Sequence, residues 1–230
     1  MLSHWETDHY RARYSSQMQK WVETLEYRLL PTFDNIKSET DQMLETLRSD
    51  FPDIENIDPF SAHEAMFEAA MNHYDMNLSV KQGLLNMFAA GLYHLFEQQV
   101  QEFNVKGRYR KRLSHASDVL KEWDEAISKS LTQHDKTSLD ELRELANTVK
   151  HGDGGAARKL YKLNPKLFQN EWERTDPEDF GVVSHKPDVY APMYGQDIYV
   201  QMEDIHRFRE LVKRVWDHYL LAFTNPTSIR

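Results

Sequence analysis

The chain of 230 residues contains no cysteine. This absence excludes a disulfide scaffold, catalysis by a thiol, and any zinc or iron–sulfur site held by cysteine. Glycine and proline are also scarce, with 8 residues of each, which favours long helices over a turn-rich β fold. Because a chain without cysteine suits a reducing compartment, we expect a cytoplasmic protein.

Long apolar runs are missing as well. Since no stretch of about 18 apolar residues occurs, no membrane-spanning helix is expected, and the opening MLSHWETD lacks the basic and apolar regions of a signal peptide. The net charge is −9, so the protein should not coat nucleic acid indiscriminately. What the chain does have is 40% hydrophobic residues, including 11 Phe, 11 Tyr and 5 Trp, which is enough for a substantial core.

Apolar residues recur at helical spacing through most of the chain, most clearly over 84–103 and 202–223. A break is conceivable within 77–83, and Ser61 with Glu64 resembles an N-cap and capping box. We therefore expect one all-α domain, an up-and-down bundle of about five to seven helices. Its parts would be a helical region at 1–60, a bundle core at 61–175 with a central helix at 138–151, a loop at 176–201 and a C-terminal helix at 202–230.

The segment 176–201 differs in composition. It holds Pro177, Pro187 and Pro192, two glycines, and short β-like runs at 180–184 and 197–200. This pattern predicts a long loop or a small β-hairpin inserted before the last helix. Loops of this length are often functional or cover a site.

The helix expected over 138–151 carries a polar stripe. Arg143, Asn147, Lys150 and His151 stand at i, i+4, i+7 and i+8, away from the helix's leucines. A guanidinium and an ammonium neutralise phosphoryl charge, and an imidazole titrates near neutral pH, so the set suits phosphate binding with proton transfer. The simpler alternative is a solvated helix face whose terminal Lys-His pair interacts favourably with the helix dipole.

The sequence also predicts where the helix that carries the stripe begins and ends. Thr137 or Ser138 is a candidate N-cap, and Gly152 should end the helix. The following Gly-rich turn opens a short helix, expected at about 154–163, that bears Arg158 and Lys159. The free N–H groups at the start of this helix could bind an anion. A plain turn between two helices is an equally simple explanation of the glycines.

A second basic cluster spans Lys106–Arg112, with Tyr109 inside it. Such a cluster could contact an RNA backbone and stack one base, or it could be a solvated loop that offsets the acidic surface. Its candidate RNA-binding residues are Lys106, Arg108, Arg110, Lys111 and Arg112, to which Arg158 and Lys159 are added.

Three polar residues stand within or beside the 84–103 apolar stripe. Gln99 lies inside it, and a buried amide requires hydrogen-bond partners. His94 and Glu97 are three residues apart, a spacing found in metal sites, but the further carboxylates of a diiron bundle are missing. We therefore expect no metal and no cofactor, and structural roles for these residues.

The stretch LRELANTVKHG, residues 142–152, resembles the signature helix of HEPN-like proteins. These are helical-bundle proteins of bacterial defence and toxin systems, and many are metal-independent RNases. The family pattern has an Arg, then four to six intervening residues, then a His, and an Asn often follows the Arg directly. Asn147 and His151 match it, whereas Ala146 stands at the Arg position and Arg143 lies outside the usual spacing. The layout of residues 80–223 is similar to that of uncharacterised bacterial members.

This resemblance implies a homodimer that places two signature helices face to face and cleaves RNA without metal. In it, His151 would act as general base or acid, Asn147 would position it, and Lys150 and Arg143 would stabilise the phosphate. The 106–112 cluster would hold the RNA, and the protein would serve as a toxin or anti-phage effector, with a protein partner in such a system.

Ala146 at the Arg position favours an alternative interpretation. The same stripe could be a hydrogen-bonding patch of a non-catalytic module that dimerises or binds a partner in a defence or signalling complex. A bundle that binds a nucleotide or another small ligand is a third interpretation.

Overall fold

The computed structural model describes residues 3–50, 59–106, 115–127, 130–175 and 186–224. These ranges contain helices and turns but no strand, which confirms the all-α prediction. The α-helices are α1 (His4–Thr24), α2 (Ile36–Asp50), α3 (Pro59–Lys106), α4 (Ala116–Ile127), α5 (Gln133–His151), α6 (Gly155–Leu163), α7 (Glu171–Thr175) and α9 (Met202–Thr224).

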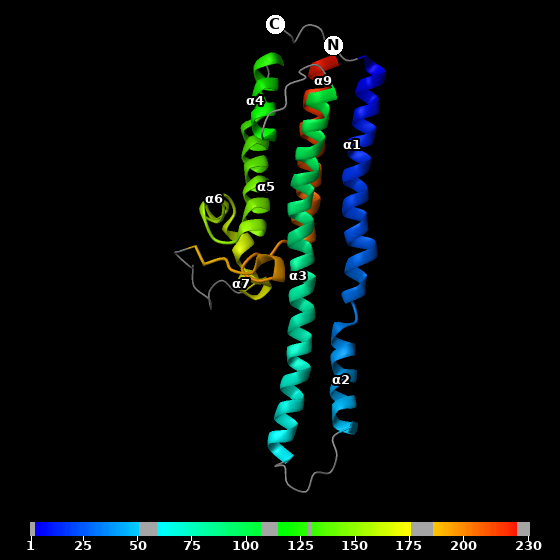
Figure 1. The fold of residues 1–230 in the computed structure, drawn as a ribbon, viewed down its shortest axis with the longest axis vertical. Coiled ribbons are helices and arrows are strands. Elements are labelled where there is room, and N and C mark those ends of the chain that lie inside the picture. Colours follow the sequence, from blue (N-terminus) through cyan, green and yellow to red (C-terminus); the bar gives the residue numbers. More distant parts are fainter. Residues whose placement is uncertain (1–2, 51–58, 107–114, 128–129, 176–185, 225–230) are drawn as a thin grey trace.

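The bundle is organised around α3, which runs along most of its length (Figure 1). Helices α1, α4, α5 and α9 surround one half of α3, whereas α2 lies beside the other half. The chain passes from α1 to α2 through a π-helical and a 3-10 segment, Leu25–Leu29 and Leu30–Phe33. Pro31 lies in the second of these, where its ring and missing N–H prevent a regular α-helix from continuing.

Aromatic side chains fill the core of the surrounded half. The Trp216 ring of α9 lies 4.5 Å from the ring of Tyr14 and 5.5 Å from that of Phe103. Trp123 of α4 lies 5.2 Å from both Phe103 and Tyr219. Since each of these side chains is almost fully buried, their removal from water ties α1, α3, α4 and α9 together.

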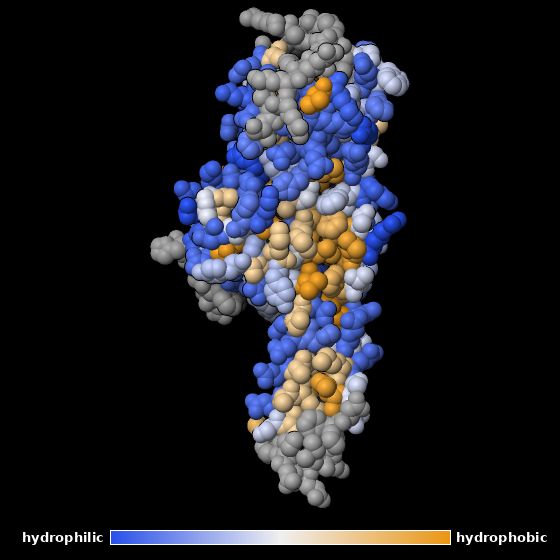
Figure 2. All heavy atoms as spheres, viewed as in Figure 1, coloured by the Kyte–Doolittle hydropathy of each residue, from blue (hydrophilic) through white to orange (hydrophobic). Residues whose placement is uncertain are grey.

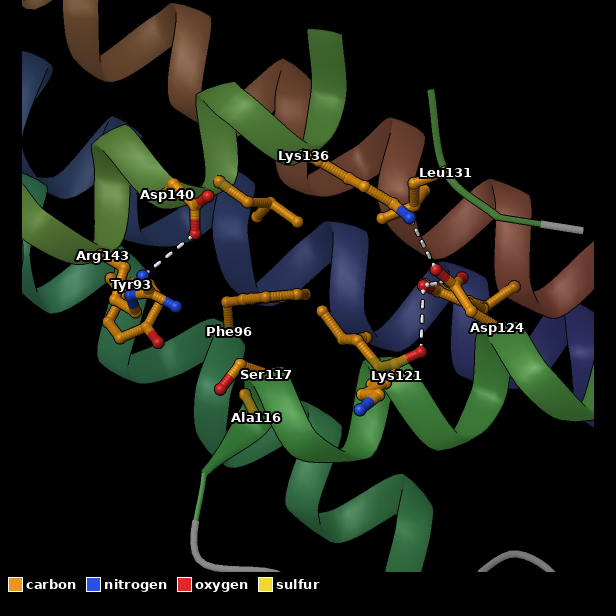
Figure 3. A pocket seen from close by; sticks show the side chains of 13 residues that line it. Tyr93, Phe96, Ala116, Ser117, Lys121, Asp124, Leu131, Lys136, Asp140 and Arg143 are labelled. Atoms are coloured by element: carbon orange, nitrogen blue, oxygen red, sulfur yellow. Dashed lines mark hydrogen bonds and ion pairs between the residues drawn. The ribbon is translucent and has the colours of Figure 1, made fainter. Parts of the chain in front are cut away.

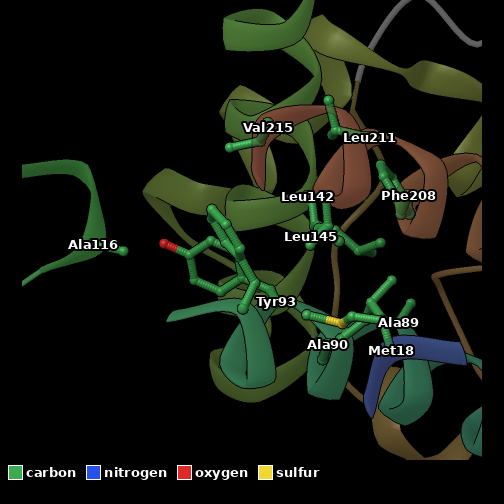
Figure 4. Close-up of a cluster of buried hydrophobic side chains, with 14 of the residues drawn as sticks. Met18, Ala89, Ala90, Tyr93, Ala116, Leu142, Leu145, Phe208, Leu211 and Val215 are labelled. Atoms are coloured by element: carbon green, nitrogen blue, oxygen red, sulfur yellow. The ribbon is translucent and has the colours of Figure 1, made fainter. Parts of the chain in front are cut away.

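The apolar face of α5 is inserted between α3 and α9. Leu142 and Leu145 are completely buried, and Figure 4 shows them between Ala89 and Ala90 of α3 and the apolar side chains of α9. Small residues on α3 allow the two helices to approach closely. This packing fixes the rotation of α5 and therefore the direction in which its polar stripe points.

Gln99 has the partners that a buried amide requires. Its Nε2 donates to Oε1 of Gln17 at 2.9 Å, and its Oε1 accepts from Nε1 of Trp216 at 3.0 Å. The amide therefore links α3 to α1 and α9, and the expected structural role is confirmed.

Three expectations about where helices begin or break were wrong. Helix α3 is continuous through 77–83, and it starts at Pro59, so Ser61 lies within the first turn and does not cap it. Proline is favoured at a helix start because the N–H that it lacks would have no acceptor within the helix at that position. Helix α5 starts at Gln133, where the Thr132 hydroxyl accepts from the Asp135 N–H at 3.1 Å. The first turn of α5 is polar, so apolar periodicity could not reveal it.

The predicted β-hairpin is not seen in the described part of segment 176–201. The backbone of residues 197–200 forms no strand: Asn86 of α3 bonds Ile198 and Val200, and the Tyr199 N–H donates to the Leu167 carbonyl. Pro192–Tyr194 forms a 3-10 turn. The other predicted run, 180–184, lies outside the described residues. The short helix and the last helix are confirmed as α6 and α9.

Candidate functional site

Helix α5 ends at Gly152, as its sequence predicts. The glycine has φ +71°, and its N–H donates to the Thr148 carbonyl at 2.8 Å. Lys150 and His151 therefore stand in the last turn, where positive charge interacts favourably with the exposed carbonyls. Both side chains are exposed to solvent.

Lys150 lines an open hollow of about 440 Å³ between α3, α5 and the segment before α9. His94 of α3 and Met193 face the same hollow. Its remaining lining residues are Met87, Ala90, Gly91 and Val149. An ammonium and an imidazole from two different helices thus share one surface depression with a largely apolar lining.

The polar groups at this end of α5 remain available to a ligand. Among the described residues, the side chains of Asn147, Lys150 and His151 form no hydrogen bond or ion pair. Asn147 is half-buried and lies one turn before His151. The His94 ring, by contrast, has Glu97 as a neighbour, with Nδ1 3.7 Å from the carboxylate.

Arg143 has a different environment. Its Nη2 lies 3.1 Å from Asp140 and 3.0 Å from Glu144, and Lys159 of α6 lies 3.6 Å from the same Glu144 carboxylate. Burial by itself lowers the pKa of Arg143, but the hydrogen bond to Glu144 and the charge of Asp140 raise it overall. The guanidinium therefore stays charged, and two carboxylates offset that charge.

Arg143 also faces a different cavity. It lines a space of about 250 Å³ bounded by α3, α4, α5 and α9, together with Tyr93 and Phe96 of α3 (Figure 3). Seven residues of helix separate it from Lys150, which corresponds to about 10 Å along the axis. The polar stripe is therefore divided between two hollows.

Only some of the predicted RNA-binding cations lie within the residues that the structure describes. Lys106 donates to Glu102 at 2.6 Å, and this hydrogen bond is the main cause that lowers the pKa of Glu102. Arg108, Arg110, Lys111 and Arg112 lie outside the described residues. Arg158 and Lys159 are exposed on α6, which directly follows the end of α5.

The wall that carries Met193 is held by Asn86, a residue that sequence reasoning missed. Asn86 is fully buried; its Nδ2 donates to the carbonyls of Pro192 and Ile198, both at 2.7 Å. Its Oδ1 accepts from the Val200 N–H at 3.2 Å. A polar residue within an apolar helical stripe was the available signal, the same signal that singled out Gln99.

A close backbone contact completes this wall. Gly195 has φ +81°, and a Cβ placed on it would lie 2.0 Å from the Ser79 carbonyl oxygen of α3. Only glycine fits both the conformation and the space. The 192–195 turn therefore packs directly on the backbone of α3.

Within the part of the chain that the structure describes, no three His, Asp or Glu side chains are grouped as a metal site would require. No described helix has the length and apolar character needed to cross a bilayer. No family model, curated protein or solved structure matches this chain, so its function has to be inferred from its own residues.

Proposed function

We propose that this chain is a HEPN-like, metal-independent endoribonuclease that acts as a homodimer, of the kind used as a toxin or anti-phage effector. The observation that carries the proposal is the end of α5, where Lys150 faces an open hollow with His94 and has no partner among the described side chains. Asn147 and His151, the two matches to the HEPN-like pattern, lie on the same side of the helix.

The chemistry follows from these groups. His151, as the general base, takes the proton from a ribose 2′-hydroxyl whose oxygen then attacks the adjacent phosphorus. The bond from phosphorus to the 5′-oxygen breaks, a 2′,3′-cyclic phosphate forms, and an imidazolium returns a proton to the leaving 5′-oxygen. Lys150 stabilises the negative charge that develops on the phosphoryl oxygens. Asn147, one turn away, positions the imidazole.

Lys150 takes the phosphate-stabilising role in this mechanism because Arg143 is already neutralised. A guanidinium between Asp140 and Glu144 contributes little net positive potential to a ligand. A homodimer with its two α5 ends facing each other supplies the second set of cations that a polyanionic substrate requires.

The test is a cleavage assay in EDTA. Purified protein is incubated with total RNA, and 2′,3′-cyclic phosphate ends are mapped. We expect cleavage that the His151→Ala variant loses. His134→Ala serves as the matched control, since His134 is an exposed histidine at the opposite end of α5. Absence of cleavage, or equal loss in both variants, would contradict the proposal.

The rim of the hollow supports a second function, a non-catalytic module for dimerisation or partner binding. Met87 and Met193 at this rim are 43% and 50% exposed, and apolar residues gather on the molecular face shown in Figure 2. Exposed apolar side chains of this kind suit a protein interface. In that case Asn147→Ala and His151→Ala would change the molar mass measured by light scattering and leave RNA intact.

A further inference from the structure

The cavity beside Arg143 has the composition of a small-molecule site. Its interior is lined by apolar side chains from four helices and by Leu131 just before α5, and its rim is charged (Figure 3). The apolar lining includes Phe96, Leu120, Leu131 and Leu139, and the charged residues are Lys121, Asp124, Lys136, Asp140 and Arg143. A concave apolar space with a few polar groups is the usual form of a ligand pocket.

Tyr93 places a hydroxyl without a partner in this cavity. The residue is only 7% exposed, and Figure 4 shows its hydroxyl directed toward Ala116, which also lines the cavity. Within the described ranges this hydroxyl forms no hydrogen bond. Tyr219, in the same cavity, donates to Asp124 at 2.7 Å. The Tyr93 hydroxyl is not among the fully buried polar atoms that lack a partner, so it meets solvent in the cavity and is free to donate to a bound acceptor.

The Tyr93 hydroxyl is a hydrogen-bond donor at neutral pH. Burial is the main cause that raises its pKa above the ordinary value, and Glu97 raises it further. The phenol therefore stays protonated. A protonated phenol donates its O–H, and this hydrogen bond is stronger when the acceptor is ionised. An anionic ligand such as a carboxylate therefore suits the Tyr93 hydroxyl better than a cationic ligand.

Arg143 adds further donors at the same end of the cavity. Its interactions with Asp140 and Glu144 use Nη2 alone, which leaves the N–H groups on Nε and Nη1 without protein partners in the described structure. Figure 3 shows Arg143 and Tyr93 together at one end. Although Asp140 and Glu144 offset the net charge of the guanidinium, its free N–H edge beside the phenol still provides a favourable pair of hydrogen-bond donors for a carboxylate.

The remaining charges favour an anion as well. Lys136 lies 3.0 Å from Asp124, so this pair is internally compensated, as is the pair of Arg143 with Asp140. Lys121 has no ion pair among the described residues. Lys121 is therefore the lining cation without a paired carboxylate among the described residues, while Arg143 is also paired with Glu144 outside the lining.

We propose that this cavity binds a small amphiphilic carboxylate, with the carboxylate at Tyr93 and Arg143 and an apolar body against Phe96 and Leu139. The site is separate from the α5 end that the ribonuclease proposal uses. Its ligand is of the size of an aryl-alkyl or medium-chain acid, in keeping with the cavity volume of about 250 Å³.

The experiment is calorimetric titration of the full-length protein with 4-phenylbutyrate and octanoate, and with neutral 4-phenylbutanamide as the matched analogue. We expect both acids to bind and the amide to bind at least about tenfold more weakly, since hydrogen bonds to charged groups are the stronger ones. Tyr93→Phe should weaken binding of the acids by about tenfold. Tyr74→Phe, on the distant part of α3, should leave it unchanged.

Tyr93→Phe keeps the buried ring and removes a hydroxyl that has no partner in the described protein. Its thermal stability without ligand should therefore equal or exceed that of the wild type, which separates lost binding from lost folding. Equal affinity for acid and amide, no binding of either acid up to about 1 mM, or full binding by Tyr93→Phe would each overturn the proposal.

Discussion

The two hollows along α5 differ in both walls and charges. Around Arg143 the walls are helices together with Leu131 just before α5, and the guanidinium is held by two carboxylates. Around Lys150 one wall is the turn that carries Met193, and the ammonium has no ion pair among the described residues. The two cations of the polar stripe therefore differ in charge compensation. Two carboxylates offset the charge of Arg143, whereas Lys150 has no such partner among the described residues.

This contrast separates stability from function. A paired, partly buried cation contributes to folding because its removal leaves a buried carboxylate behind. An exposed cation without a partner contributes little to folding, and its electrostatic potential remains available for binding. The expected effects below decrease from the first to the last.

The largest effect should come from Asn86→Ala, which removes the bonds that hold the turn against α3. It leaves the Pro192 and Ile198 carbonyls and the Val200 N–H without this partner. We expect the free energy of unfolding to fall by about 3 kcal/mol or more, measured by urea denaturation. Asn77→Ala is the control, because Asn77 bonds only within its own helix. A loss below about 1 kcal/mol would mean that the turn is held otherwise.

Lys150→Ala and Arg143→Ala compare the two cations in the proposed reaction. We expect Lys150→Ala to lower the initial rate of RNA cleavage by about 100-fold, because it removes a group that stabilises developing charge. Arg143→Ala should change the rate by less than about threefold, since two carboxylates compensate its charge. Rates measured in EDTA well below the melting temperature test this, and the reverse order would return the phosphate role to Arg143.

The same two variants should have the opposite order in stability. Arg143→Ala leaves the buried Glu144 with Lys159 alone, so we expect a loss of about 1–3 kcal/mol in the free energy of unfolding. Lys150→Ala should stay within about 0.5 kcal/mol of the wild type. Chemical denaturation of both variants checks the prediction, and equal losses would contradict the division between paired and unpaired cations.

The smallest effect concerns the ion pair that joins the end of α5 to the segment before α9. Lys186 donates to Asp153, and this hydrogen bond is the main cause that lowers the pKa of Asp153. A lowered carboxylate pKa stabilises the contact above the usual carboxyl value, and the stabilisation is lost as the pH falls through the lowered pKa.

Amide hydrogen exchange across 186–190 can follow this loss. Protection factors of the wild type should fall as the pH drops from about 4, the ordinary carboxyl value, through the lowered pKa of Asp153. The Asp153→Asn variant should have the lower protection throughout, with little change over this interval. A wild type whose protection does not depend on pH would show that the ion pair does not hold the segment.

Local patterns predicted the helices with strong apolar periodicity. The spacing of Ile205, Phe208 and Leu211 marks α9, and Gly152 marks the end of α5. The polar first turn of α5 and the uninterrupted course of α3 were missed, since neither has a local signal that separates it from a loop or a break. The bonds of Asn86 to a distant turn could not be predicted, because apolar periodicity does not reveal which segments pair across the fold.

The candidate site was predictable in composition but not in arrangement. The sequence by itself determined that Arg143, Asn147, Lys150 and His151 share one side of a helix, because helical geometry depends only on positions along the chain. Only the tertiary structure decided that Lys150 shares a hollow with His94 and that Arg143 shares a cavity with Tyr93. The physical reason is that burial and charge compensation depend on neighbours supplied by other helices.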